Sequence, residues 1–272
     1  MTKTLIIKDH LTPLEEEEFV HSIHKGEFDQ INWSGKEPLE WDIHWQTMQF
    51  LIDCDLAKNI FIHYTTNLST IEWRRRNLFK DILPHFKGSH INATIMATDK
   101  TSEYLMEKVS WNQWVSHLNL AIANSLKNRN QSVSFDFVLT LPGLLSIKDI
   151  FSFINERDLI LNSRVVNDTG PECILSPLVL PRFLLNELVD NTVRSIFSEV
   201  KNHHHLRLVK TLLDLKKDLV HEEVYPDTWK QSFKIGKEKM LAREGMRKDQ
   251  LKFIDILSSH AKVKSWWLQQ ED

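Results

Sequence analysis

The alternation of short apolar stretches with segments of helical spacing constrains the fold of this chain most. The stretches FDQINWSG, NIFIHYTTN, HINATIM and SVSFDFVLT predict strands; NIFIHYTTN is rich in β-branched and aromatic residues, and SVSFDFVLT alternates cleanly between polar and apolar residues. Strands that alternate with helices favour a parallel sheet with right-handed crossovers. Roughly five or six strands suit an open sheet or partial barrel better than a complete eight-stranded barrel.

The rest of the sequence is predicted to be mainly helical. No glycine-rich linker divides the chain, but beyond residue 180 every remaining segment reads as a helix. We therefore predict an α/β domain over residues 1–180, a partial parallel (β/α) barrel, and a helical C-terminal extension over residues 181–272 packed on it. Within the first part we expect helices at 11–26, 42–56, 73–83, 101–108, 111–126 and 146–154 (capped by Ser146), with further strands at 4–8 and at LILNSRVV and CILSPLVL.

Charge and composition exclude several classes of protein. The formal net charge of −3 gives neither a basic face for nucleic acid nor an acidic tail. No run of about 18 apolar residues exists that could span a membrane. The start, MTKTLIIKDHLTP, has too short an apolar core for a signal peptide and is typical of a natural beginning, so we expect a cytoplasmic protein. Only 7 glycines occur, which argues mildly against a glycine-built ligand cradle.

The two cysteines, Cys54 and Cys173, lie far apart and without CxxC spacing. This pattern makes a disulfide framework, a structural zinc site and a protein-only cluster site implausible. Cys54 lies in a helical pattern and is expected to be a small buried residue.

Other conspicuous residues have plain structural interpretations. Consecutive histidines at 203–205 point in different directions on a helix, so we expect structural or exposed histidines rather than a metal site. His44 and His63 could face a pocket, but burial with a hydrogen-bond partner is the expectation. Trp266 and Trp267 could anchor a partner, and we expect them to pack the last helix.

Polar residues gather where three predicted strands end. Ser34 and Glu37 follow the first, Thr66 and Asn67 follow the second, and Thr94 ends the third. Ligands bind at the carboxyl ends of strands in parallel α/β proteins, so these residues predict the mouth of a pocket. The same residue types also cap helices and form turns, and the sequence leaves both roles open.

Several motifs follow one another in a consistent order over most of residues 27–272. INWSGKEPL resembles INWSGGEPL, HYTTNLS resembles a TNLS or TNGT strand end, and ATIMATDKTSEYLMEKVSWNQWV is similar to SIDATG-x-SEYIR-x-G-x-x-W. Through these motifs the chain resembles the radical S-adenosylmethionine (radical SAM) superfamily. LTLPGLLSIKDIFSFI and ILSPLVLP match the subgroup with a twitch half-domain. The resemblance implies a radical SAM-like barrel, a peptide or other small-molecule substrate, and contact with S-adenosylmethionine at Ser34, Gly35, Lys36, Glu37, Pro38, Thr66, Asn67 and Thr94.

The positions that would hold the family's cofactors differ from its pattern. The resemblance implies a [4Fe–4S] cluster held by the thiolates of a CxxxCxxC loop, yet no cysteine precedes Gly35 and none is available for an auxiliary cluster. Lys36 replaces the second glycine of GGEP, Met96 the acidic residue of SID, and Met106 the arginine of EYIR. Positions expected to pack, by contrast, still match; they are Trp33, Pro38, Tyr104, Trp111 and Trp114.

Two functional hypotheses follow. In the first, the chain is a radical SAM, twitch-type relative that cannot start the reaction alone because the iron–sulfur ligands are missing. In the second, it is a non-catalytic scaffold or partner-binding subunit, a pseudoenzyme, that binds a protein or metabolite in the former substrate cleft. A fragment whose missing N-terminus carried the cysteines is a third interpretation. A barrel opened at its first strands would expose a sheet edge, so we expect an oligomer or a repaired edge. The partners we consider are a protein partner or a second copy of the chain in a homo-oligomer.

Overall fold

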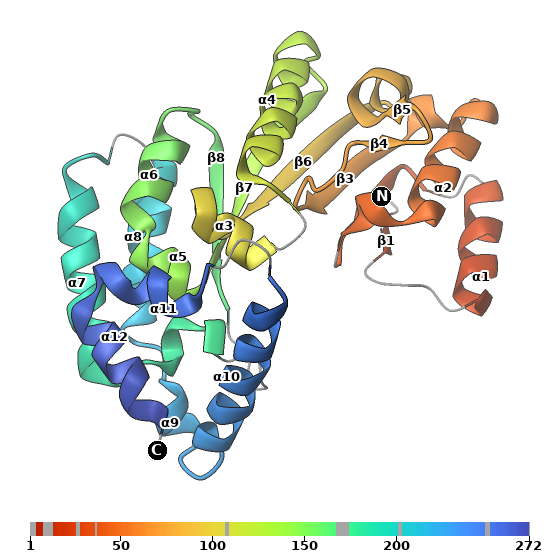
Figure 1. Cartoon of the computed structure of the whole chain (residues 1–272). Helices are drawn as coiled ribbons and strands as arrows, with labels where there is room; N and C mark the ends of the chain where they lie inside the picture. The colour runs from red at the N-terminus through yellow and green to blue at the C-terminus, as the bar shows by residue number, and fades with distance from the viewer. Residues whose placement is uncertain are drawn as a thin grey trace. The chain divides into compact units, whose positions relative to one another are not determined.

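The structure, a computed structural model, describes residues 4–7, 13–25, 28–35, 37–106, 109–166, 174–200, 203–247 and 251–271. Six strands form one sheet in the order β1-β2-β3-β6-β7-β8, and two short strands form a separate pair, β4-β5 (Figure 1). The neighbouring strands β1, β2, β3 and β6 pair in parallel. This mostly parallel open sheet with its helices confirms the predicted α/β class and partial barrel. The strands are β1 Thr4–Ile7, β2 Gln30–Trp33, β3 Phe61–Thr66, β4 Glu72–Trp73, β5 Arg76–Asn77, β6 Gly88–Ile95, β7 Gln131–Leu139 and β8 Ile160–Val165.

Side chains alternate between the two faces of the sheet, most regularly on β3. There Ile62, Tyr64 and Thr66 are buried, whereas Phe61, His63 and Thr65 are half-buried. The pairing register sets His63 of β3 opposite His90 of β6, so both imidazoles lie on the same face of the sheet. Because side chains alternate with a period of two, the whole apolar set of a strand turns to one side.

Helices of the first compact unit, residues 1–94 and 108–136, supply much of its core. Helix α2 buries Trp45, Met48 and Leu51 at helical spacing. Helix α4 begins after Ser110, whose side chain caps it by accepting a hydrogen bond from the Gln113 N–H at 3.2 Å. The helices of this unit are α1 Pro13–His24, α2 Asp42–Asp53 and α4 Trp111–Lys127, with the short turns η1 Pro38–Glu40, η2 Ala57–Asn59, η3 Leu78–Ile82 and η4 Leu83–His85.

His44 of α2 belongs to this core. Its ring lies edge-on to Trp33 with centroids 4.8 Å apart, and its Nε2 is 2.9 Å from the hydroxyl of Tyr64. Complete burial lowers the pKa of His44 to about 3, so the ring is neutral. The expected buried, hydrogen-bonded histidine is confirmed at this position.

The second compact unit, residues 95–107 and 137–272, is mainly helical. Helix α8 packs along β8, where the hydroxyls of Ser163 and Thr211 are 2.7 Å apart. Trp266 and Trp267 are buried against Phe233 with centroids 5.6 and 5.1 Å away, which confirms that they pack the last helix. The helices are α3 Asp99–Met106, α5 Leu141–Leu145, α6 Ile147–Asn155, η6 Pro177–Val179, α7 Arg182–Phe197, α8 His203–Leu215, α9 His221–Val224, α10 Trp229–Met246, α11 Phe253–Ile256, η7 Leu257–Ser259, α12 Ala261–Leu268 and η8 Gln269–Glu271.

Four local predictions were wrong, one of them only in part. The predicted helix 73–83 is instead the β4-β5 pair followed by the short helical turn η3, because Arg74 and Arg75 adopt positive φ angles and reverse the chain.

The described part of CILSPLVL contains the turn η6 rather than a strand, since Pro177 begins a helical turn. Ser146 is the N-cap residue of α6, as predicted, but its hydroxyl bonds back to the Pro142 carbonyl, so the predicted side-chain capping bond is absent. Cys54 follows the last residue of α2 and is exposed, not buried.

The division into compact units groups residues 137–180 with the C-terminal helices. This grouping by contacts does not test whether residues 181–272 form a separate extension, and the predicted boundary between residues 180 and 181 stays a prediction. Among the helices that the structure describes, none is long and apolar enough to cross a membrane.

Candidate functional site

The carboxylate of Glu37 connects the ends of strands β2 and β3. Its Oε1 accepts hydrogen bonds from the Leu39 N–H at 3.1 Å and from the Thr66 hydroxyl at 2.6 Å. Its Oε2 accepts a hydrogen bond from the Asn67 N–H at 2.6 Å. Both oxygens of the carboxylate are thus held by protein donors, in a side chain that is only 5% exposed.

Burial dominates the acidity of this group. Desolvation raises the pKa of Glu37 to about 7, although the donors on Thr66, Asn67 and Leu39 act in the opposite direction. The carboxyl group therefore exchanges its proton near neutral pH, and it can hold or release that proton at the end of two neighbouring strands.

The structure brings together three of the predicted site residues, Glu37, Thr66 and Asn67. Turn formation accounts for part of their geometry: Glu37 caps η1, and Thr66 Oγ1 accepts a hydrogen bond from the Leu68 N–H at 2.9 Å. The predicted capping role is thus present, and a role in binding S-adenosylmethionine stays a prediction.

The other predicted site residues are placed separately. The hydroxyl and backbone N–H of Ser34 both donate to the Ile7 carbonyl, at 3.3 and 2.9 Å. Gly35 has a φ of 111°, a conformation that glycine adopts without strain. Pro38 is buried as the first residue of η1. Thr94 donates from its hydroxyl to Asp136 Oδ2 at 3.4 Å, and Lys36 lies outside the described residues.

A second cluster lies on the polar face of β3, β6 and β7, and we call it the polar sheet face; its members are His63, His90, Asn92, Thr94, Ser132, Ser134 and Asp136. His90 Nδ1 is 2.8 Å from the Ser132 hydroxyl, and its Nε2 is 3.0 Å from the Ser134 hydroxyl. Ser134 in turn donates to Asn92 Oδ1 at 2.8 Å. Because the single Ser134 proton is used for Asn92, His90 must donate from Nε2 and accept at Nδ1.

Burial favours the neutral form of both histidines on this face. Burial lowers the pKa of His63, and burial followed by the nearby His63 lowers the pKa of His90. The two rings lie 6.0 Å apart between centroids. Uncharged imidazole, hydroxyl and amide groups along adjacent strands can exchange hydrogen bonds with a polar, uncharged ligand.

Sequence reasoning found only part of this face. His63 was a candidate and Thr94 was predicted from its strand end, but Ser132, Ser134 and Asp136 were read only as an alternating strand. The signal that could have found them is their own period of two in SVSFDFVLT, which places all three on one face.

The donor atoms of the chain do not fit an iron–sulfur cluster. Such clusters are held chiefly by cysteine thiolates, and the chain has only two cysteines, fewer than a CxxxCxxC loop supplies. Cys54 is exposed at the end of α2, and Cys173 lies outside the described residues. Within the part of the chain that the structure covers, no group of three or more His, Cys, Asp or Glu residues could hold a metal ion.

Comparison with known proteins adds little. No family model matches the sequence. No curated protein matches it either. A solved structure of Streptococcus suis SuiB bound to the precursor peptide SuiA aligns with a TM-score of 0.42 and 12% sequence identity, over 79% of this chain and 51% of SuiB. The chain thus spans about half the length of that protein.

Proposed function

We propose that this chain is a radical SAM-related binding protein that does not assemble the iron–sulfur cluster itself. The observation that carries the proposal is the mismatch between scaffold and cofactor positions. Trp33, Tyr104 and Trp114, which match the family motifs, are buried core residues, whereas the cluster cysteines are absent from the chain.

The ligand surface of the proposal is the polar sheet face. Its hydrogen-bonding groups are imidazoles, hydroxyls and an amide together with the carboxyl group of Asp136, which is buried and accepts from Thr94, and His63 is half-buried rather than enclosed. Backbone amides of a peptide supply both donors and acceptors, which suit neutral imidazole, hydroxyl and amide partners. We therefore propose that the ligand is a peptide segment. It belongs to a protein partner or to a second copy of the chain, and binding takes place in the cytoplasm.

The runner-up is a protein that still binds S-adenosylmethionine and receives a cluster from a partner. The grouping of Glu37, Thr66 and Asn67 at the strand ends favours it, because these residues lie in the segments that resemble the cofactor motifs. In that case Glu37 would hold the strand ends in position, since its carboxylate oxygens are both engaged by protein donors.

Anaerobic reconstitution with ferrous iron and sulfide tests the missing cluster, and calorimetric titration with S-adenosylmethionine tests the runner-up. We expect no stoichiometric iron or sulfide after desalting and no detectable heat at millimolar ligand. Retention of iron and sulfide in a cluster ratio would contradict the proposal. Micromolar binding of S-adenosylmethionine without a cluster would favour the runner-up instead.

Selection of a random peptide display library against the immobilised chain tests the ligand surface. We expect peptides to be enriched by the native chain and lost when His63→Ala is used as bait. The variant His21→Ala is the matched control, because His21 is exposed on α1 and distant in sequence from the three strands. Failure to enrich peptides, or equal binding to both variants, would rule out the polar sheet face as a peptide site.

A further inference from the structure

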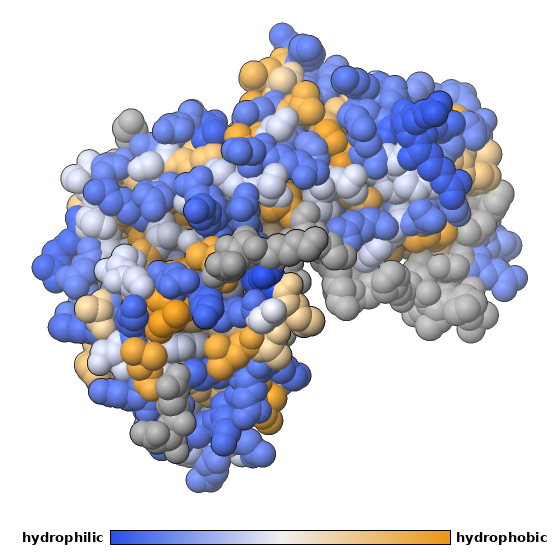
Figure 2. All heavy atoms as spheres, viewed as in Figure 1, coloured by the Kyte–Doolittle hydropathy of each residue, from blue (hydrophilic) through white to orange (hydrophobic). Residues whose placement is uncertain are grey.

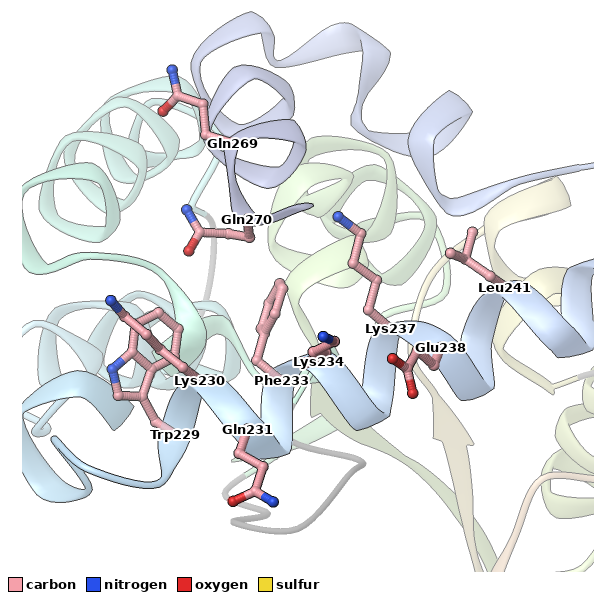
Figure 3. Close-up of a pocket in the computed structure, with 10 residues that line it drawn as sticks. All are labelled: Trp229, Lys230, Gln231, Phe233, Lys234, Lys237, Glu238, Leu241, Gln269 and Gln270. Carbon is pink, nitrogen blue, oxygen red and sulfur yellow. The ribbon is translucent and has the colours of Figure 1, made fainter. Parts of the chain in front are cut away.

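A pocket of about 600 Å³ lies between helix α10 and the C-terminal turn η8, outside the polar sheet face. Its volume is within the range of roughly 300–1,000 Å³ that is typical of small-molecule sites. Phe233 and Lys237 point from α10 toward Gln270 on the opposite wall (Figure 3). Every residue of the pocket belongs to the second compact unit, so the pocket is complete within that unit.

The apolar part of the pocket is aromatic and fixed. Phe233 is 2% exposed and meets Trp229 edge-on with centroids 6.1 Å apart. Phe233 also packs edge-on against Trp266, with centroids 5.6 Å apart. The side-chain amide of Gln270 is held by a hydrogen bond to the Trp266 carbonyl at 3.2 Å. The locked rings of Phe233 and Trp229 form the rigid floor of the pocket and keep only a small part of their surface open, beside Leu241, which is 55% exposed.

The charged part of the pocket is basic. Lys230, Lys234 and Lys237 recur at helical spacing along α10, so they share one side of the helix, and Glu238 is the acidic residue in the lining. Lys237 is 7% exposed; its Nζ donates to the Trp267 carbonyl at 3.3 Å and lies 5.5 Å from the centre of the Trp267 ring. Figure 2 shows hydrophilic and hydrophobic residues interspersed over the surface of α10, α11 and α12.

We propose that this pocket binds a small anion with a flat apolar body, such as an aromatic carboxylate, sulfonate or phosphate. The aromatic floor, with Leu241 beside it, takes the body, and the ammonium groups of Lys230 and Lys234 at the open side attract the anionic group. Low dielectric near the buried Lys237 strengthens this attraction relative to that on a fully exposed helix face. The proposal concerns a site separate from that of the proposed function and does not depend on it.

Two fluorescent probes test the proposal on the full chain. The aromatic sulfonate 8-anilinonaphthalene-1-sulfonate has the proposed chemistry, and N-phenyl-1-naphthylamine is the same body without the charge. We expect Lys234→Gln to weaken binding of the sulfonate about three-fold, the effect of one partly exposed ion pair, and Lys230→Gln/Lys234→Gln to weaken it further. Neither change should affect the neutral probe. The matched control is Lys239→Gln, an exposed lysine of α10 outside the pocket lining.

The same titrations in low and high sodium chloride complete the test. We expect added salt to weaken the sulfonate and to leave the neutral probe unchanged. Equal binding of the sulfonate to the native chain, Lys234→Gln and Lys239→Gln would overturn the proposal, as would a loss of both probes together. Absence of saturable sulfonate binding would overturn it as well.

Discussion

Glu37 shows how a single buried carboxyl group makes stability depend on pH. Its pKa is raised from 4.5 to about 7 by burial, so the folded chain binds this proton more tightly than the unfolded chain does. The stability that the proton contributes is complete below pH 4.5 and is lost as the pH rises through 7. We expect the free energy of unfolding to fall by about 1–3 kcal/mol between pH 5 and pH 8 because of this group.

Urea denaturation of Glu37→Gln at several pH values measures this contribution. The variant lacks the titrating group, so its free energy of unfolding should not decrease between pH 5 and pH 8 through this group. Because a glutamine amide has a single acceptor oxygen, one of the hydrogen bonds from Asn67, Leu39 or Thr66 is weakened at every pH. The control Glu18→Gln, an exposed carboxylate on α1, should keep the native slope. An unchanged slope in Glu37→Gln would show that another group is responsible.

Tyr64 supplies the hydrogen-bond partner for a neutral histidine in the core. Tyr64→Phe removes the hydroxyl 2.9 Å from His44 Nε2 and leaves that nitrogen buried without this partner. We expect the unfolding free energy to drop by about 1–3 kcal/mol, the cost of an unsatisfied buried polar group. Tyr225→Phe, at a tyrosine that is 38% exposed, should change it little in the same denaturant titration. Equal effects of the two variants would mean that the His44–Tyr64 bond contributes nothing measurable.

At the scale of elements, the start of β6 is limited by the space around Gly88. A Cβ atom there would lie 2.4 Å from the Asn130 carbonyl oxygen and 2.7 Å from the ring of Phe61, closer than atoms can approach. Gly88→Ala should therefore destabilise the chain by about 1–3 kcal/mol or more, since backbone and ring must both shift.

Gly245→Ala is the natural comparison for Gly88→Ala. It lies in α10 with no atom within 4 Å of the added methyl group. Alanine favours a helix over glycine, so thermal unfolding should show a gain of up to about 1 kcal/mol. A loss of stability at Gly245, or none at Gly88, would contradict this account of the two glycines.

The sequence predicts individual strands better than the contacts between distant elements. Strands β2, β3, β6 and β7 follow from local patterns of apolar and β-branched residues, and the parallel pairing of β2, β3 and β6 follows from the connections between them. The meeting of Glu37 with Thr66 was predictable too, because parallel strands end at one edge. The conformation of the segment around Trp73 was not predictable from periodicity. It depends on tertiary contacts, since the Trp73 ring stacks on Trp45 and its N–H donates to Asp42. The hydrogen bond between Ser134 and His90 was not predictable either, because it depends on the register in which β6 and β7 pair.

At the scale of the whole molecule, the C-terminal helices complete the core of the second compact unit. Helix α8 packs along β8 and carries Leu208, Leu212 and Leu215, each fully buried, beyond the predicted boundary at residue 180. Full burial of one such side chain contributes about 1.5–3 kcal/mol. Three of them therefore approach the total stability of a typical domain, about 5–15 kcal/mol.

A fragment of residues 1–180 should consequently fail to fold on its own. We expect it to aggregate or to unfold without a cooperative transition, because removal of α8 uncovers β8 and the apolar residues around it. Point variants in the full chain separate this cause from truncation itself: Leu212→Ala should cost about 2–5 kcal/mol, whereas Leu206→Ala, at a leucine of α8 that is 47% exposed, should stay near native. A soluble, cooperatively unfolding 1–180 fragment would instead establish residues 181–272 as a separable extension of an independent α/β domain.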